Sequence, residues 1–219
     1  ILRDFGMDAE VRFEQDRLYS DASLTPERLV ATAHALSGTD QSMRSMALGR
    51  RAVAEVGPAA QNHRLVYPVL VRETLTESSK ANGLDPAMVA SLIKQESGFN
   101  PRATSPVGAR GLMQLMPSVG RTLARSSGIS GYNDEMLYDP AISIRLGTRH
   151  LSGLFRRTSN AERVLAAYNA GESRVARWIQ KAGAQDPEVF TERIPFIETR
   201  DYVRAVVRNR AFYAALYDW

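Results

Sequence analysis

The chain has 219 residues, of which 44% are hydrophobic and 24% are charged. This composition is typical of a folded globular protein and argues against disorder as the dominant state. At roughly 150 residues per domain, the length favours one full domain with a smaller appended unit. The complete absence of cysteine excludes disulfides, cysteine-based zinc sites, iron–sulfur clusters and a cysteine nucleophile.

The formal net charge is +4, an excess too small to indicate a nucleic-acid binder, whose charge is usually concentrated on one stripe or arm. A basic surface would nevertheless attract an anionic polymer of any kind. No apolar run reaches the ~18–20 residues that a membrane helix needs. The sequence begins at Ile1 without a signal-peptide pattern or initiator methionine, so we expect a mature or trimmed piece of a longer protein.

Residues 1–60 carry the pattern of stacked short helices. Thr25 followed by Pro26 predicts a helix start, and Gly38 suits the end of that helix. A second apolar face at helical spacing follows and stops near Gly57. We expect a linker around 57–66 and divide the chain into a helical, superhelix-like segment at 1–64 and a second domain at 65–219.

Beyond residue 65 the capping signals become denser, and strands are hard to find. Two helices are predicted, one from Tyr67-Pro68 to Asn82-Gly83 and one from Asp85-Pro86 to Gly98. Further helix starts are indicated at Asp139-Pro140 and Asn160, and a long helix at about 199–217. The predicted fold class is therefore all-α, α+β lysozyme-like at most, with a small hairpin or irregular loop near 101–117.

Glu96 breaks the pattern of its helix. It lies three and four positions after Ile93 and Leu92, so its carboxylate projects from the apolar face. Burial and the negative end of the helix dipole both favour the protonated form, which predicts a raised pKa. A glutamic acid held protonated near neutral pH can act as a general acid. The alternative is a buried glutamate paired with an arginine.

The loop after this helix contains groups that suit a polar ligand. Gly108 and Gly111 allow the backbone to approach a ligand closely, and Ser105 and Gln114 offer a hydroxyl and an amide. Turns use the same residue types, so this pattern alone is weak.

Several short segments between residues 93 and 203 form a distinctive set. They read IKQESGFNP at 93–101, Ser at 105, GLMQLMP at 111–117, AAYNAG at 166–171, RVARW at 174–178 and IPFIETRDYV at 194–203. Taken together and in this order, they resemble the soluble-type lytic transglycosylases, the family of peptidoglycan lytic murein transglycosylases that carry an SLT domain. The resemblance covers roughly residues 65–217.

The resemblance implies a lysozyme-like helical domain with a substrate groove and Glu96 as its single catalytic carboxylate. It implies that Tyr168 hydrogen-bonds to Glu96 and orients it. The groove residues that it implies, and that would bind substrate, are Ser105, Gln114, Met116, Asn169, Glu198 and Tyr202.

It also implies a mechanism that needs neither cofactor nor metal. Glu96 would protonate the bond between N-acetylmuramic acid and N-acetylglucosamine, the substrate's acetamide would stabilise the positive charge, and Glu96 would then act as base to form a 1,6-anhydro ring. Other acids lie in a loop and a helix cap, at Asp134, Glu135 and Asp139. The three histidines lack metal-ligand spacing and are expected at the surface or in the core.

The implied partner is the glycan strand of peptidoglycan, with no nucleic acid, and the implied location is the periplasm or bacterial cell envelope. Residues 1–60 resemble the end of a helical superhelix by pattern and position only. Three alternatives stay open: a hydrolytic muramidase of goose-lysozyme type, a non-catalytic peptidoglycan-binding module and a basic nucleic-acid-binding helical protein.

Overall fold

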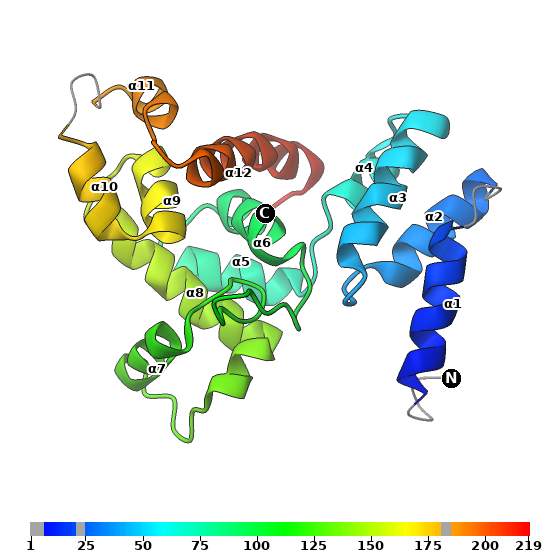
Figure 1. The fold of residues 1–219 in the computed structure, drawn as a ribbon, viewed down its shortest axis with the longest axis horizontal. Helices are drawn as coiled ribbons and strands as arrows, with labels where there is room; N and C mark the ends of the chain where they lie inside the picture. Colours follow the sequence, from blue (N-terminus) through cyan, green and yellow to red (C-terminus); the bar gives the residue numbers. More distant parts are fainter. Residues whose placement is uncertain (1–6, 21–24, 181–184) are drawn as a thin grey trace. The chain divides into compact units, whose positions relative to one another are not determined.

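The computed structural model describes residues 7–20, 25–180 and 185–219. Within these ranges the regular secondary structure is helical, and β-structure is limited to two isolated bridges. The all-α fold class is therefore confirmed. The chain divides into two compact units, residues 1–70 and residues 71–219, and Figure 1 shows the helices of each unit.

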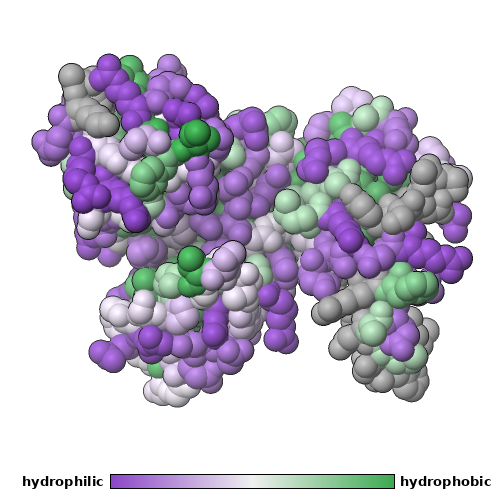
Figure 2. Space-filling model, in the orientation of Figure 1, coloured by the Kyte–Doolittle hydropathy of each residue, from purple (hydrophilic) through white to green (hydrophobic). Residues whose placement is uncertain are grey.

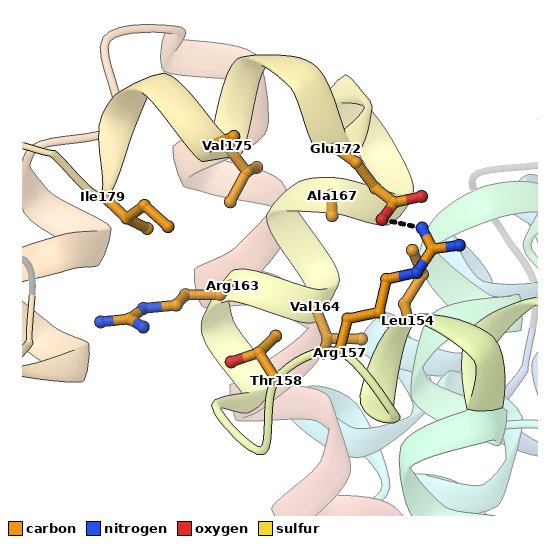
Figure 3. A pocket seen from close by; sticks show the side chains of 10 residues that line it. Leu154, Arg157, Thr158, Arg163, Val164, Ala167, Glu172, Val175 and Ile179 are labelled. Atoms are coloured by element: carbon orange, nitrogen blue, oxygen red, sulfur yellow. Dashed lines mark hydrogen bonds and ion pairs between the residues drawn. The ribbon is translucent and has the colours of Figure 1, made fainter.

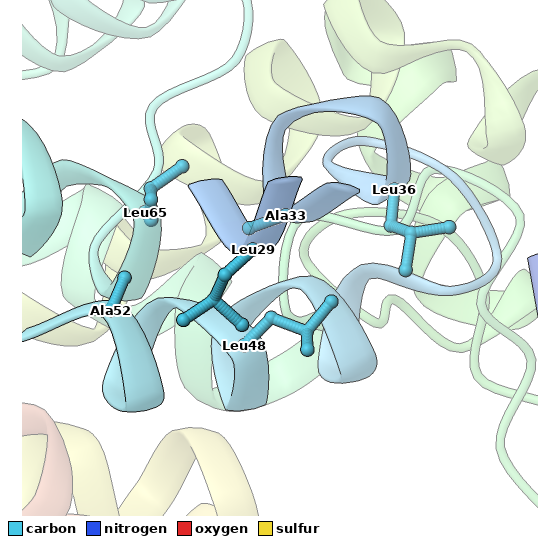
Figure 4. Close-up of a cluster of buried hydrophobic side chains, with 6 residues drawn as sticks. All are labelled: Leu29, Ala33, Leu36, Leu48, Ala52 and Leu65. Carbon is cyan, nitrogen blue, oxygen red and sulfur yellow. The ribbon is translucent and has the colours of Figure 1, made fainter. Parts of the chain in front are cut away.

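The N-terminal unit contains four helices in its described part: α1 (Asp8–Ser20), α2 (Pro26–Leu36), α3 (Ser42–Glu55) and α4 (Ala60–Val66). Thr25 caps α2 as predicted, because its side chain accepts a hydrogen bond from the Arg28 amide. Leucine and alanine side chains from α2, α3 and α4 form one apolar core, shown in Figure 4: Leu29, Ala33, Leu36, Leu48, Ala52 and Leu65.

The predicted linker at 57–66 is wrong, because most of it is α4. This helix has no side-chain N-cap, so the capping signal that predicts other helices is missing. Helix α4 is stabilised by packing instead. A Cβ on Gly49 of α3 would overlap Leu65, so the glycine allows α3 and α4 to approach closely. The division between the units follows Leu70 rather than residue 64, because Leu65 belongs to the core of the first unit.

The second unit contains the remaining helices. Their bounds are α5 (Arg72–Ala81), α6 (Pro86–Ser97), α7 (Pro117–Ser126), the 3₁₀ helix η2 (Asp134–Tyr138), α8 (Pro140–Phe155), α9 (Ala161–Ala170), α10 (Glu172–Trp178), α11 (Pro187–Glu192) and α12 (Ile197–Leu216). Side-chain caps lie at the predicted positions Asp85, Asp139 and Asn160. Helix α5 begins later than its predicted start at Tyr67-Pro68, because Val71 adopts a left-handed conformation with φ 48° just before Arg72.

Helix α6 lies at the centre of this unit. Its residues from Pro86 to Ile93 are all buried, which shows that the helix is covered on every side. Helix α12 packs along α6, α9 packs against α12, and α8 packs against both α5 and α9 (Figure 1). The C-terminal end of α6, where Glu96 lies, is therefore held between elements from distant parts of the sequence.

The segment 101–117 forms the irregular hairpin-like loop that the sequence predicts. Arg110 makes an isolated antiparallel bridge to Thr104 on one side and to Leu115 on the other. Gly111 lies within this loop at φ 76°, and a Cβ there would collide with the carbonyl oxygen of Leu137. The loop can therefore pass this close to η2 only with glycine at this position.

Among the described residues, no helix combines the length and apolar character needed to cross a membrane.

Candidate active site

Glu96 lies in the last turn of α6, and its carboxylate is held by a tyrosine from α12. The hydroxyl of Tyr202 donates a hydrogen bond of 2.6 Å to Oε1 of Glu96. Gly98 ends the helix in a left-handed conformation at φ 59°. The partner of Glu96 is thus a neutral hydroxyl, not the arginine that the alternative interpretation required. The Glu96 side chain keeps partial exposure, so a substrate atom can reach it.

The electrostatic environment of Glu96 favours its protonated form. The pKa of Glu96 is raised to about 7 as the net result of three causes: burial raises it most, the hydrogen bond from Tyr202 lowers it, and the carboxylate of Glu198 raises it. A low-dielectric environment penalises a lone charge, whereas a donated hydrogen bond stabilises it. Desolvation outweighs the hydrogen bond, so the predicted increase in pKa is confirmed. A carboxyl group with this pKa can give a proton and later accept one near neutral pH.

Tyr168 does not make the hydrogen bond that the resemblance implied. Its hydroxyl donates to the backbone carbonyl of Met113 at 2.7 Å, and the single proton of a hydroxyl cannot be donated twice. The ring remains close enough for the charge of Glu96 to raise the pKa of Tyr168. Tyr202 therefore holds the carboxylate of Glu96, and Tyr168 fixes the loop at Met113.

A cavity of about 350 Å³ brings together three of the predicted groove residues and Tyr168. Gln114, Met116, Tyr168 and Asn169 all line it, together with residues of α8 and the start of α10. The side chain of Asn169 is fixed by α12, because Thr199 of that helix donates a hydrogen bond of 2.7 Å to Oδ1 of Asn169. The segments 111–117 and 166–171 thus form one wall each of the same cavity.

Two predicted groove residues have mainly local contacts in the loop. The Ser105 hydroxyl accepts a hydrogen bond from the Ala109 amide at 3.0 Å, which closes the turn at 105–109. Gln114 has a left-handed backbone with φ 48°, and its amide donates to the carbonyls of Ala103 and Gly111. Because a hydroxyl and an amide each have further hydrogen-bonding capacity, both residues can still bind a polar ligand.

The two predicted residues from α12 differ in exposure. Glu198 is exposed and close enough to act on the pKa of Glu96. Tyr202 is only 5% exposed, and its predicted contact with substrate stays a prediction. What the structure shows is its action on Glu96, because its hydroxyl is bound to the carboxylate.

The other acidic candidates have structural roles. Asp134 pairs with Arg121, Glu135 pairs with Arg110, and Asp139 caps α8. No group of three or more histidine, aspartate or glutamate side chains in the described residues is arranged to hold a metal ion.

Comparison with known proteins identifies the same region of the chain. The family described as "Transglycosylase SLT domain" matches residues 73–191, more than half of the chain. The chain belongs to this family. The match lies within the second unit and includes Glu96, Gln114 and Tyr168.

The related proteins are named as lytic murein transglycosylases. Over 151 residues the chain is 36% identical to the soluble lytic murein transglycosylase of Escherichia coli; the matched part is 67% of this chain and 23% of that protein. It is 33% identical over 152 residues to the membrane-bound lytic murein transglycosylase C of Salmonella arizonae, covering 59% of this chain and 42% of that protein. The chain thus spans about a quarter of the soluble relative's length.

Solved structures show a similar fold. The lytic transglycosylase Slt of Pseudomonas aeruginosa, in an inactive Glu-to-Gln mutant, matches with a TM-score of 0.80 and 28% identity, covering 100% of this chain and 36% of that one. The 70 kDa soluble lytic transglycosylase of Escherichia coli matches with a TM-score of 0.78 and 28% identity, covering 98% and 34% of the two chains. These matches confirm the lysozyme-like fold of the SLT domain family.

His150 and Glu172 are two cavity residues that sequence reasoning missed. His150 was expected at the surface or in the core without a role, but it lines the cavity of this SLT domain, with its ring centroid 5.3 Å from that of Tyr168. Burial lowers the pKa of His150, which favours a neutral imidazole. Glu172 follows Gly171 of the recognised motif, and this position was the one signal that could have identified it.

Proposed function

We propose that this chain is a lytic transglycosylase of the SLT domain family that cleaves the β-1,4 bond between N-acetylmuramic acid and N-acetylglucosamine in peptidoglycan. The observation that carries the proposal is the Glu96 carboxyl group, whose pKa is raised to about 7 and whose Oε1 is held by Tyr202. The names of the relatives support murein as the substrate. Its glycan strands would lie in the cavity lined by Gln114, Met116, Tyr168 and Asn169.

In the first step, protonated Glu96 gives its proton to the oxygen of the glycosidic bond. The bond from this oxygen to C1 of the muramoyl residue breaks, and the oxygen of the 2-acetamido group stabilises the positive charge at C1. This use of the substrate explains how one carboxyl group suffices, since Asp134 and Glu135 are already committed to ion pairs.

In the second step, the Glu96 carboxylate accepts the proton of the muramoyl C6 hydroxyl. The C6 oxygen then bonds to C1 and displaces the acetamido oxygen, which forms the 1,6-anhydro ring. Glu96 ends protonated as it began, and no water is consumed. A pKa of about 7 suits both steps, because neither protonation state is strongly disfavoured near neutral pH.

The test is mass analysis of products released from purified peptidoglycan. The proposal predicts products lighter by one water than those of hydrolysis, and hydrolytic products would instead show a goose-type muramidase. Glu96→Gln keeps the shape of the side chain but cannot donate this proton, so we expect its rate to fall roughly 10³-fold. Activity that survived this change would remove Glu96 from the mechanism, and binding without cleavage by the unaltered chain would show a binding module.

We also propose that the chain acts in the bacterial cell envelope, where murein is found, and that a superhelix-like segment, expected at residues 1–64 and extending to residue 70 as a compact unit, precedes the catalytic domain in the sequence. This assignment is supported by the helical unit at residues 1–70 and by structural matches that cover at least 98% of the chain.

A further inference from the structure

Tyr138, the last residue of η2, contacts the loop at 101–117 with both parts of its side chain. Its hydroxyl shares a hydrogen bond of 2.6 Å with the hydroxyl of Thr104, 34 positions earlier in the sequence. Its ring lies under the guanidinium of Arg110, which is 5.5 Å from the ring centroid. Arg110 also pairs at 2.7 Å with Glu135 of the same 3₁₀ helix. The loop is therefore anchored to η2 through two of its own residues.

Thr104 and Arg110 lie opposite each other in the loop, where they form an isolated antiparallel bridge. Backbone hydrogen bonds of 2.9 Å flank this pair on both sides. This is the pattern of a non-hydrogen-bonded pair, in which the two side chains lie on one face and close together. Because Tyr138 contacts both side chains of the pair, it fixes both sides of the loop at once.

The residue before Thr104 holds the side chain of Gln114. The carbonyl of Ala103 accepts a hydrogen bond of 3.1 Å from the side-chain amide of Gln114, and the carbonyl of Gly111 accepts a second one of 2.8 Å. An amide nitrogen carries two protons, so both are used inside the loop and the side-chain oxygen is left for a ligand. Gln114 lines the cavity. The place at which it offers this oxygen therefore depends on the position of Ala103.

Regular secondary structure contributes little to this geometry. The β-structure of the loop is limited to the two isolated bridges of Arg110, and Gln114 has a left-handed backbone that residues other than glycine seldom adopt. Such a conformation persists only where the surrounding structure holds it. Much of the surface in Figure 2 is hydrophilic, and the exposed hydroxyl of Thr104 would otherwise bond to water. The bond to Tyr138 gives it a fixed partner instead.

From these contacts we propose that Tyr138 is a positioning residue for glycan binding. Through the hydroxyl of Thr104 it fixes the loop segment 103–105, and through the neighbouring carbonyl it holds the side-chain oxygen of Gln114 in the cavity. The proposal rests on the proposed function, because the ligand that Gln114 would bind is the glycan strand. Tyr138 itself would not contact the strand.

The effect of this anchor is confined to the loop. The carboxylate of Glu96 is held by Tyr202 from α12, without a contribution from η2. The pocket of about 290 Å³ between α8, α9 and α10, shown in Figure 3, is lined by residues between Leu154 and Ile179, outside the loop. Loss of the anchor should therefore weaken binding of the glycan and leave the acid–base chemistry of Glu96 unchanged.

Two substitutions remove the hydrogen bond from opposite ends. Tyr138→Phe keeps the ring beneath Arg110 and loses only the hydroxyl. Thr104→Val keeps the branched shape of the side chain and loses its hydroxyl. Thr104→Ser retains a hydroxyl at this position, so it should keep the bond and behave like the unaltered chain.

The matched controls remove the same groups elsewhere in this unit. Tyr132→Phe removes a buried hydroxyl that has no hydrogen-bond partner among the described residues. Thr122→Val removes an exposed hydroxyl that donates to the Ser118 carbonyl within α7. Neither hydroxyl is hydrogen-bonded to the loop, so neither control should affect Gln114.

Cleavage of purified glycan strands measures the effect. Tyr138→Phe and Thr104→Val should each raise KM about threefold or more and keep kcat within about twofold, because binding is weakened and the chemistry is not. The pH at which activity falls on the alkaline side should not move. Thr104→Ser and both controls should keep KM within about twofold. An unchanged KM in Tyr138→Phe and Thr104→Val, or a shifted pH profile in either, would overturn the proposal.

A second comparison shows whether Tyr138 acts through Gln114. Gln114→Asn suits the left-handed backbone but shortens the side chain by one methylene, which moves the amide away from the Ala103 carbonyl. In this background Tyr138→Phe should change KM less than about 1.5-fold, because the effects of coupled residues are not additive. A rise as large as that in the unaltered chain would overturn the route through Gln114.

A measurement without substrate separates this proposal from the proposed function. The side-chain amide protons of Gln114 can be followed by NMR, and their bonds to two carbonyls should slow their exchange with water. Tyr138→Phe should speed this exchange by about threefold or more, whereas Tyr132→Phe should not. A failure of transglycosylation with this difference intact would count against the reaction only. Unchanged exchange in Tyr138→Phe would count against the positioning role only.

Discussion

Tyr202 on α12 and Glu96 at the end of α6 are 106 positions apart in the sequence, and their side-chain oxygens are 2.6 Å apart in the structure. This bond works against the desolvation that raises the pKa of Glu96. The carboxyl group is therefore balanced between burial, which favours the acid, and a hydroxyl donor, which favours the base. Each contribution can be removed separately.

Removing the Tyr202 hydroxyl should raise the pKa of Glu96. Tyr202→Phe keeps the buried ring but removes the donor that stabilises the carboxylate. The fall in activity at alkaline pH, which marks deprotonation of Glu96, should therefore move to higher pH. The measurement is kcat/KM against pH, with peptidoglycan turnover as the readout.

Tyr168→Phe is the matched control, since this hydroxyl donates to the Met113 carbonyl and not to Glu96. In this variant we expect the fall in activity at alkaline pH, the alkaline limb of the pH profile, to shift less than in Tyr202→Phe. A larger shift in Tyr168→Phe than in Tyr202→Phe would mean that Tyr168 holds the carboxylate during the reaction.

Removing the charge of Glu198 should have the opposite effect. The negative charge of Glu198 raises the pKa of Glu96, so Glu198→Gln should lower it. The alkaline limb of the pH profile should then move to lower pH, opposite in sign to the Tyr202→Phe shift. Because Glu198 is exposed and screened by salt, the shift should shrink at high ionic strength. An upward shift would contradict the electrostatic role given to Glu198.

The raised pKa of Glu96 also predicts a dependence of stability on pH. Between the ordinary value of 4.5 and about 7, the folded state holds this proton more tightly than the unfolded state. The contribution of Glu96 to stability is therefore fully present below about pH 4.5 and is lost as pH rises through about 7. The Glu96→Gln variant has no carboxyl group at this position and does not lose this stability. Its free energy of unfolding should therefore rise, relative to that of the unaltered chain, by up to about 3 kcal/mol by pH 8.

Thermal or denaturant unfolding of both proteins across this pH range measures the difference. Asp201→Asn on the exposed surface of α12 is a control for the loss of one acidic side chain. A stability difference for Glu96→Gln that is the same at pH 4 and pH 8 would mean that Glu96 titrates normally.

Gly111 should be required for the loop at 101–117. An alanine there would force a Cβ into the Leu137 carbonyl at a positive φ, so we expect Gly111→Ala to cost about 2–4 kcal/mol of unfolding free energy. Gly108 is the matched control, because it has φ 86° in the same loop but a Cβ there would have no heavy atom within 4 Å apart from its chain neighbours.

Gly108→Ala should cost about 1–2 kcal/mol, from backbone strain alone. Urea unfolding of both variants measures the two costs. Equal losses would show that backbone conformation, and not the close approach to η2, is what requires glycine at position 111.

Most of the helices could be predicted from the sequence, because their limits are set by local chemistry. Asp85, Asp139 and Asn160 each accept a hydrogen bond from an amide two or three residues further along the chain, so a short stretch of sequence decides the helix start. Glu96 was predictable for a related reason, since a carboxylate on an apolar helix face is conspicuous in any context.

The remaining features were decided only by tertiary structure. Helix α4 lacks a side-chain cap and depends on the close approach that Gly49 allows. The motifs placed Tyr168 and Tyr202 at the site, but whether each holds Glu96 or the Met113 carbonyl depends on how α9, α12 and the loop pack together. Short-range hydrogen bonds follow from neighbouring residues, whereas contacts between distant segments depend on packing that local sequence does not specify.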